Sequence, residues 1–177
     1  YTALAWVELY YDNDLVMAAR HFERALQLDA TNTAVLSSAG ALLLRLRRFD
    51  SAIAIMEYTA ERNPLSTIAF FNLGENYFAA SRFEESARAF QTALELSPGY
   101  RGGYLWLSKA LLLSGKTAEA LEAARKESFE PFRKLAVALA AFAAGEQAEA
   151  DAALDWMVEK GGPHYPYDIA SVFAYRK

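Results

Sequence analysis

The chain has 177 residues, of which 54% are hydrophobic and 14% aromatic, so it can bury a core and is not a disordered tail. Its net charge of -4 argues against a nucleic-acid partner, because nucleic-acid-binding domains are usually basic. It has no cysteine, which excludes disulfides and thiolate metal sites and fits a cytoplasmic location. The longest apolar run, Leu135–Ala144, is too short to cross a bilayer, so we expect no membrane partner.

We expect an all-α fold, because alanine and leucine dominate the chain and runs of β-branched residues are few. A small residue recurs at a fixed spacing of 34 positions, at Ala18, Ala52, Ser86 and Ala120. A period of this length predicts a stacked array of helix–turn–helix units, because each unit must present the same face to its neighbour. The predicted domain organisation is therefore a single array over residues 1–177.

The first predicted unit covers residues 1–32, and bulky Trp6 stands where the next two units have a glycine. We interpret Asp14 as the N-cap of the second helix. The alternative, a calcium loop, lacks the glycine and the distal glutamate that such a loop requires. His21 is expected to face solvent. Because His164 is the only other histidine and no cysteine can join it, no metal site is predicted.

The second and third predicted units cover residues 33–66 and 67–100. Their apolar residues recur three and four positions apart, which is the spacing of one helix face. Ser81 is followed three residues later by Glu84, and we interpret this pair as a capping box that starts a second helix. Gly74 is expected to let the two helices of the third unit approach closely.

The fourth and fifth predicted units cover residues 101–128 and 129–162, and a partial sixth unit supplies one helix at residues 166–177. Gly115 and Gly145 are expected to end the first helix of their units. The letters SGKT around Gly115 resemble the end of a phosphate-binding loop, but the glycine required five positions earlier is absent, so a turn is predicted. The last helix lacks a second helix, and we expect the natural chain to continue.

The third unit carries the spaced residues of a known family. Its marks are Phe70, Leu73, Gly74, Tyr77, Ser86, Phe90 and Pro98. With Ser86 in place of the usual alanine, they resemble the tetratricopeptide repeat (TPR), whose pattern is W-x2-L-G-x2-Y, then A-x3-F, then P. The resemblance implies an α-α superhelix, or solenoid, of about five repeats plus an unpaired helix, with a concave binding side.

Three further segments narrow this resemblance. They are YYDNDLVMAARHFERALQLDA at 10–30, GKTAEALEAARKE at 115–127 and YDIASVFAYRK at 167–177. They are similar to the C-terminal repeat region of bacterial class III adenylate cyclases and of regulators with a winged-helix domain. This implies a regulatory arm of a bacterial signalling protein, whose catalytic or DNA-binding domain precedes Tyr1. The alternative is a stand-alone adaptor for an assembly or secretion system.

The predicted partner-binding residues lie on the concave side, which the first helix of each repeat forms. They are Ser37, Leu44, Arg45, Phe71, Glu75, Phe78, Leu105, Lys109, Leu112 and Phe142. Most are apolar, and an exposed apolar patch usually marks an interaction site. The alternative is that superhelical curvature buries them against one another. The predicted occupants are a protein or peptide segment, the protein's own N-terminal domain, or a second copy that forms a homodimer.

The sequence predicts no catalytic residue and no cofactor. No nucleophile motif and no pair of carboxylates in an apolar context stands out. A clamp for acidic C-termini is not predicted either, because Asn72 alone among the matching positions has a suitable side chain. We therefore expect a non-enzymatic scaffold that binds no nucleic acid.

Overall fold

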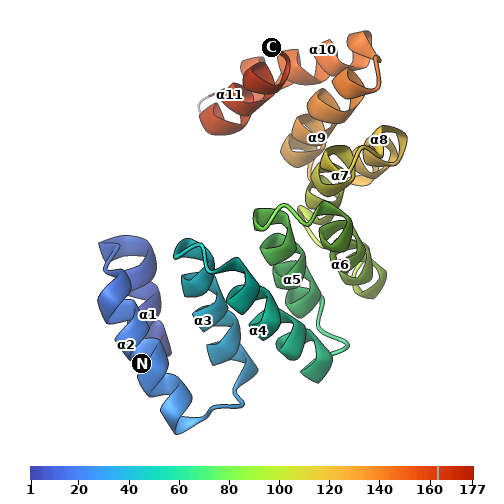
Figure 1. Ribbon diagram of the computed structural model, residues 1–177. Helices are drawn as coiled ribbons and strands as arrows, with labels where there is room; N and C mark the ends of the chain where they lie inside the picture. Colours follow the sequence, from blue (N-terminus) through green and yellow to red (C-terminus); the bar gives the residue numbers. More distant parts are fainter. Residues whose placement is uncertain (163) are drawn as a thin grey trace. The chain divides into compact units, whose positions relative to one another are not determined.

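The computed structural model describes residues 1–162 and 164–177, and all regular structure in them is helical (Figure 1). The chain folds as two compact units, Tyr1–Arg82 and Phe83–Lys177. The predicted third repeat therefore contributes its first helix to unit 1 and its second helix to unit 2. The single array over residues 1–177 remains a prediction.

Unit 1 is a succession of short helices, each packed against the next. They are α1 (Thr2–Val7), which continues into the π-helical turn η1 (Glu8–Asp12), α2 (Leu15–Leu28), α3 (Thr33–Arg45), α4 (Phe49–Arg62) and α5 (Thr67–Ala79). The first helices of the pairs also touch, because α3 packs against both α1 and α5. We call the surface that α1, α3 and α5 share the first-helix face of unit 1.

Unit 2 follows the same plan. Its helices are α6 (Phe83–Leu96), α7 (Gly103–Leu113), α8 (Thr117–Lys126), α9 (Glu130–Ala143), α10 (Gln147–Trp156) with the π-helical turn η2 (Met157–Gly161), and α11 (Pro166–Tyr175). Its first-helix face consists of α7, α9 and α11, and α9 packs against the other two. None of the helices in the described part of the chain is long and apolar enough to cross a membrane.

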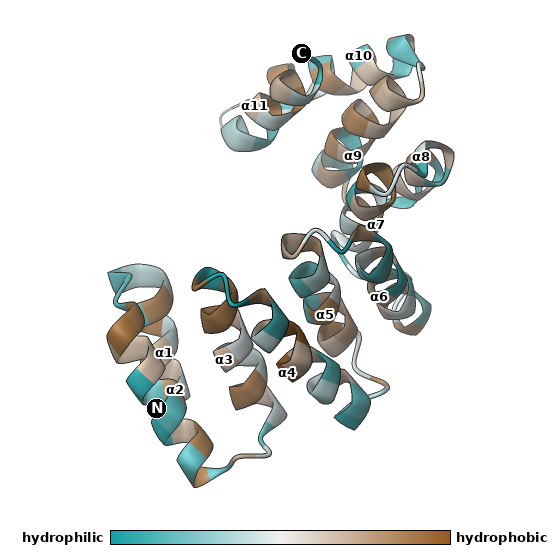
Figure 2. Cartoon of the chain, in the orientation of Figure 1, coloured by the Kyte–Doolittle hydropathy of each residue, from teal (hydrophilic) through white to brown (hydrophobic). Residues whose placement is uncertain are grey.

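The small residues at the 34-residue spacing lie in the core. Ala18, Ala52, Ser86 and Ala120 are each 0% exposed. Gly40 belongs to a different position of the repeat, on the first helix of the pair, and it faces the Met56 side chain of the second helix. A β-carbon built on Gly40 would collide with the Met56 side-chain methyl, so α3 and α4 approach closely here. The helices carry both hydrophobic and hydrophilic stretches (Figure 2).

The tight turn after each first helix places one residue in the left-handed region. These residues are Asn13, Arg47, Ser81, Gly115 and Gly145, with φ between +53° and +82°. The first four are 34 positions apart and the last step is 30. The prediction that Gly115 and Gly145 end helices is confirmed, since each amide donates to a carbonyl in the last turn of its helix.

The capping box predicted at Ser81 is wrong. Ser81 has φ +60° and closes α5, and its amide donates to the Phe78 carbonyl at 2.9 Å. The next amide, that of Arg82, donates to the Tyr77 carbonyl at 2.9 Å. These two bonds form the helix ending known as a Schellman motif, in which one residue adopts the left-handed conformation. Glycine is the usual residue there, and serine adopts this conformation at a higher energetic cost.

Two predictions for the first repeat have opposite outcomes. The Asp14 N-cap is confirmed, because its carboxylate accepts bonds from the amides of Val16 and Met17 at 3.1 and 3.0 Å. The prediction that His21 faces solvent is wrong. Its Nδ1 lies 2.7 Å from Oε2 of Glu8, and both side chains are partly buried where η1 meets α2.

The start of α7 is stabilised from a distance rather than by its own cap. Gly102, at φ +82°, precedes the helix and has no side chain to offer. Glu127, 1% exposed, supplies the carboxylate: Oε2 accepts from the Leu105 amide at 3.4 Å and Oε1 from the Phe129 amide at 3.1 Å. One buried side chain therefore fixes the beginning of α7 and the beginning of α9 together.

Candidate partner-binding surface

The first-helix face of unit 1 encloses a cavity of about 160 Å³. Three of the predicted partner-binding residues line it, namely Ser37, Leu44 and Glu75. The predicted residues Phe71 and Phe78 are half-buried on α5 and do not line it. The structure thus brings together α1, η1, α3 and α5 around one opening, where sequence reasoning had expected an apolar track.

The α5 wall of this cavity carries polar groups that lack partners. Asn76 is 5% exposed, and its Nδ2 donates to the backbone carbonyl of Asn72 at 2.7 Å. Its Oδ1 is buried and has no hydrogen-bond partner in the described chain. Glu75 is half-buried, and burial raises the pKa of its carboxyl group. Such unpaired groups are costly, and native proteins contain few of them.

The opposite wall is aromatic. Trp6 stacks on Tyr10 with ring centroids 4.7 Å apart and planes 10° from parallel, and its indole Nε1 donates to Oγ of Ser38 at 2.9 Å. The predicted residue Arg45 lies at the edge of this wall, with its guanidinium 5.6 Å from the Tyr10 centroid and a 2.9 Å bond to Oδ1 of Asn13. Burial raises the pKa of Tyr10, Arg45 lowers it and Glu75 raises it, so the phenol stays neutral at physiological pH.

Six lining residues of this cavity are not among the predicted partner-binding residues: Trp6, Tyr10, Ala41, Met56, Asn72 and Asn76. The available signal was Trp6, which occupies the place of a glycine in the next two repeats. A large side chain there cannot pack as a glycine does, and the indole instead lies across the first-helix face. The two asparagines give no periodic signal, because their importance depends on what α1 places opposite them.

The predicted residues of unit 2 have different surroundings. Leu105 is 5% exposed and belongs to the core. Leu112 is half-buried on α7. Phe142 on α9 is in edge-to-face contact with Tyr175 at a centroid distance of 6.3 Å, and the Arg176 guanidinium lies 5.1 Å from its ring centre. The end of α11 therefore lies against Phe142.

Lys109, the remaining predicted residue, is half-buried beside Trp106, with Nζ 5.2 Å from the ring centroid. Burial lowers the pKa of Lys109, and the Asp168 carboxylate on α11 raises it. The last helix therefore supplies both an aromatic contact and a counter-charge to this face.

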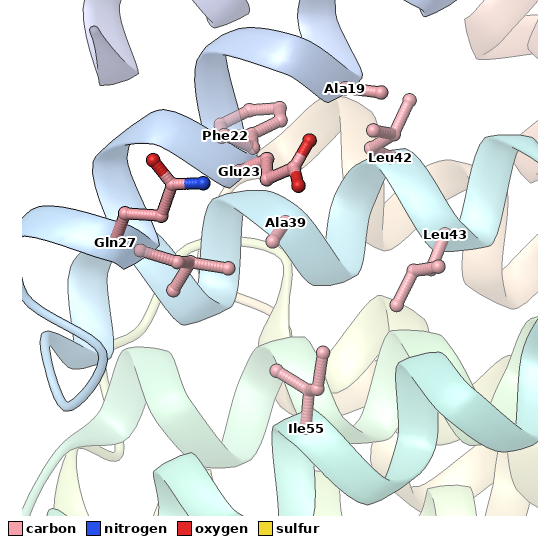
Figure 3. A pocket seen from close by; sticks show the side chains of 9 residues that line it. Ala19, Phe22, Glu23, Gln27, Ala39, Leu42, Leu43 and Ile55 are labelled. Atoms are coloured by element: carbon pink, nitrogen blue, oxygen red, sulfur yellow. The ribbon is translucent and has the colours of Figure 1, made fainter.

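A second and larger hollow, of about 490 Å³, lies between α2, α3 and α4 in unit 1 (Figure 3). Its lining is apolar, with Phe22, Leu42 and Ile55 among the residues around it, while Glu23 and Gln27 are exposed. It was not predicted and lies outside the first-helix face. It lacks the converging polar groups that orient a specific ligand.

The described residues contain no group of three or more His, Cys, Asp or Glu side chains that could hold a metal ion. The tetratricopeptide repeat family matches residues 37–101 and 71–130, which together make up more than half of the chain. The chain belongs to the tetratricopeptide repeat family. Its members are generally non-catalytic proteins that bind other proteins or peptides.

Individual TPR proteins agree with this assignment. The tetratricopeptide repeat-containing protein trd-1 of Caenorhabditis elegans is 27% identical over 124 residues, which cover 68% of this chain but 16% of that protein. The solved structure of TTC0263, a TPR protein of Thermus thermophilus, is similar with a TM-score of 0.76 at 21% identity, covering 98% of this chain and 97% of the other. The predicted all-α TPR fold class is confirmed.

The structure of YrrB, described as a TPR protein with an unusual peptide-binding site, is similar with a TM-score of 0.64 at 17% identity. The match covers 88% of this chain and 83% of YrrB. At this identity the likeness concerns the fold.

Proposed function

We propose that this TPR chain is a non-catalytic scaffold that binds a segment of a partner protein on the first-helix face of unit 1. The observation that supports this most directly is the cavity between α1, α3 and α5, with unpaired polar groups on one wall and aromatic rings on the other. A partner segment lying there would pair those groups and cover the half-buried side chains of Phe71 and Phe78.

The unit 2 residues of the same predicted surface contribute less in this proposal. The proposal does not require Lys109, Leu112 and Phe142, because Tyr175 of α11 contacts Phe142 and Asp168 of α11 acts on the charge of Lys109. Leu105 is buried and belongs to the core of unit 2. A peptide segment fits the site better than a second copy of the chain, since a cavity of about 160 Å³ takes a side chain and not a helix.

The experiment that tests this proposal is selection from a random library of displayed peptides, panned against the whole chain. Enriched peptides are then measured against Leu44→Ser and against Leu65→Ser. Leu44 lines the cavity, whereas Leu65 is 84% exposed in the loop after α4 and receives the same chemical change. We expect Leu65→Ser to bind as the wild type does and Leu44→Ser to bind about tenfold more weakly, which corresponds to roughly 1.4 kcal/mol. Equal binding by both variants, or no enriched peptide, would show that the face is not a peptide site.

We further propose the cellular setting that the sequence resemblance implies, a cytoplasmic regulatory arm of a bacterial signalling protein such as an adenylate cyclase. It is supported by the segments 10–30, 115–127 and 167–177. Reading the gene upstream of Tyr1 tests it. A cyclase or winged-helix domain in the same frame is the expected result. A start codon shortly before Tyr1 would favour the adaptor for an assembly or secretion system instead.

A further inference from the structure

The unit 1 cavity combines three features that together select one kind of side chain. The first is the orientation of Asn76. Its Nδ2 already donates to the Asn72 carbonyl at 2.7 Å. Turning the amide over would place Oδ1 against another carbonyl oxygen, so the orientation is set by chemistry. Oδ1 is therefore a hydrogen-bond acceptor without a donor in the described chain, and Asn76 is only 5% exposed.

The second feature is the carboxylate of Glu75, one residue away on α5 and lining the same cavity. It forms no hydrogen bond or ion pair within the part of the chain that the structure describes. The nearest cation on this face, Arg45, is engaged with Asn13 and with the ring of Tyr10. A donor that also carries a positive charge would satisfy both Asn76 and Glu75.

The third feature is the stacked pair of Trp6 and Tyr10, which lines the cavity opposite Glu75 and Asn76. Aromatic faces attract cations, and Arg45 already lies over Tyr10 in this way. The aliphatic part of a long cationic side chain would pass along the apolar lining residues Ala41, Leu44 and Met56.

Because the cavity measures about 160 Å³, it is smaller than the usual pocket for a small-molecule ligand and matches a single side chain. We propose that it receives the ammonium group of a lysine side chain presented by the partner segment. This inference rests on the proposed function and specifies the chemistry of the partner. An ammonium is a compact charge with three donors, which suits an amide oxygen, a carboxylate and the Ser37 hydroxyl better than the planar fork of arginine does.

The test is a titration of the ¹⁵N-labelled whole chain, followed by NMR. The probe is Nα-acetyl-lysine N-methylamide. The control compounds are the same derivatives of norleucine, whose side chain is uncharged, and of arginine. The signals to watch are the side-chain amides of Asn72 and Asn76 and the indole N–H of Trp6. We expect saturable shifts of these signals with the lysine compound and none with the norleucine compound.

Two variants sharpen the test. Glu75→Gln keeps the shape and removes the charge, and we expect it to weaken binding of the lysine compound at least about tenfold. Glu61→Gln makes the same change in net charge at an exposed position of α4 and should bind as the wild type does. Circular dichroism checks that both variants are folded.

The outcomes separate this inference from the proposed function. Equal shifts with norleucine would overturn the lysine assignment and leave an apolar peptide site. Tighter binding of the arginine compound would overturn the choice of lysine. Unchanged binding by Glu75→Gln, or no shift with any compound, would also overturn it, and the Leu44→Ser panning would then decide by itself whether the face binds peptides.

Discussion

The two units present the same kind of surface but fill it differently. In unit 1 the first-helix face has a cavity whose polar groups lack partners. In unit 2 the last helix, α11, packs on α9, Tyr175 and the adjoining Arg176 contact Phe142, and the Asp168 carboxylate raises the pKa of Lys109. Equivalent positions in the two units are therefore not equally available to a partner. What a residue can bind depends on whether another helix of the chain already covers it.

A core substitution in unit 1 should have the largest effect on stability, and it tests whether the two units unfold separately. Phe22, 2% exposed, is a core residue of unit 1, and Phe22→Ala should lower the free energy of unfolding by about 3–5 kcal/mol. Hydrogen exchange should then speed up in α1 to α4 and stay unchanged in α9 to α11, because contacts in repeat proteins are local. Equal acceleration in both units would show that they unfold as one.

Two substitutions at helix starts, one in each unit, are expected to lower stability by an intermediate amount. Glu127→Ala in unit 2 removes a buried carboxylate that accepts bonds from two backbone amides, and we expect a loss of about 2–3 kcal/mol. Asn32→Ala in unit 1 removes a local N-cap on α3 and should cost about 1 kcal/mol. Urea unfolding measures both. A smaller loss for Glu127→Ala than for Asn32→Ala would contradict the bridging role of Glu127.

The smallest expected effect is a pH dependence of opposite sign in the two units. Burial raises the pKa of Glu75, so the folded state holds more protons than the unfolded state between the ordinary value of 4.5 and the raised one, and stability falls as pH rises through that window. Burial lowers the pKa of Lys109, so stability rises as pH rises from the lowered value towards 10.5.

Thermal unfolding over a pH series checks this sign. Glu75→Gln should be more stable than the wild type above the acidic window and should lose the fall that begins near pH 4.5. Glu61→Gln, at an exposed position, serves as the control and should retain that fall. A wild type whose stability rises through the acidic window relative to Glu75→Gln would contradict the assignment.

The features that the sequence predicts well are those that repeat. The spacing of Ala18, Ala52 and Ser86 predicts core positions because the same packing demand recurs in every pair, and the structure buries all three completely. Gly115 and Gly145 are predictable for a similar reason, since a left-handed residue must follow each first helix and glycine adopts that conformation at the lowest cost.

The features that the sequence does not predict depend on the surroundings of single side chains. Ser81 adopts the left-handed conformation that Gly115 and Gly145 adopt in the later repeats, but a serine side chain also suits a helix N-cap, so the spacing of Ser81 and Glu84 led to a wrong prediction. Leu105 looks like a groove residue by helical phase, yet it is buried. The cavity is lined by Trp6 and Asn76, which are far apart in the sequence. Their positions do not follow the repeat spacing, so the sequence pattern does not indicate that they lie near each other.

The fixed turn inside each repeat has a consequence for where the chain tolerates changes in length. The step from Gly115 to Gly145 is 30 residues instead of 34, yet both turns keep the left-handed residue. The four missing residues coincide with a shorter second helix in the fourth repeat. Helix α8 has 10 residues, whereas α2, α4 and α6 each have 14. Tags and inserted domains therefore belong in the loops between pairs, such as the one at Leu65, and not at Arg47, where one added residue would turn the next helix out of register.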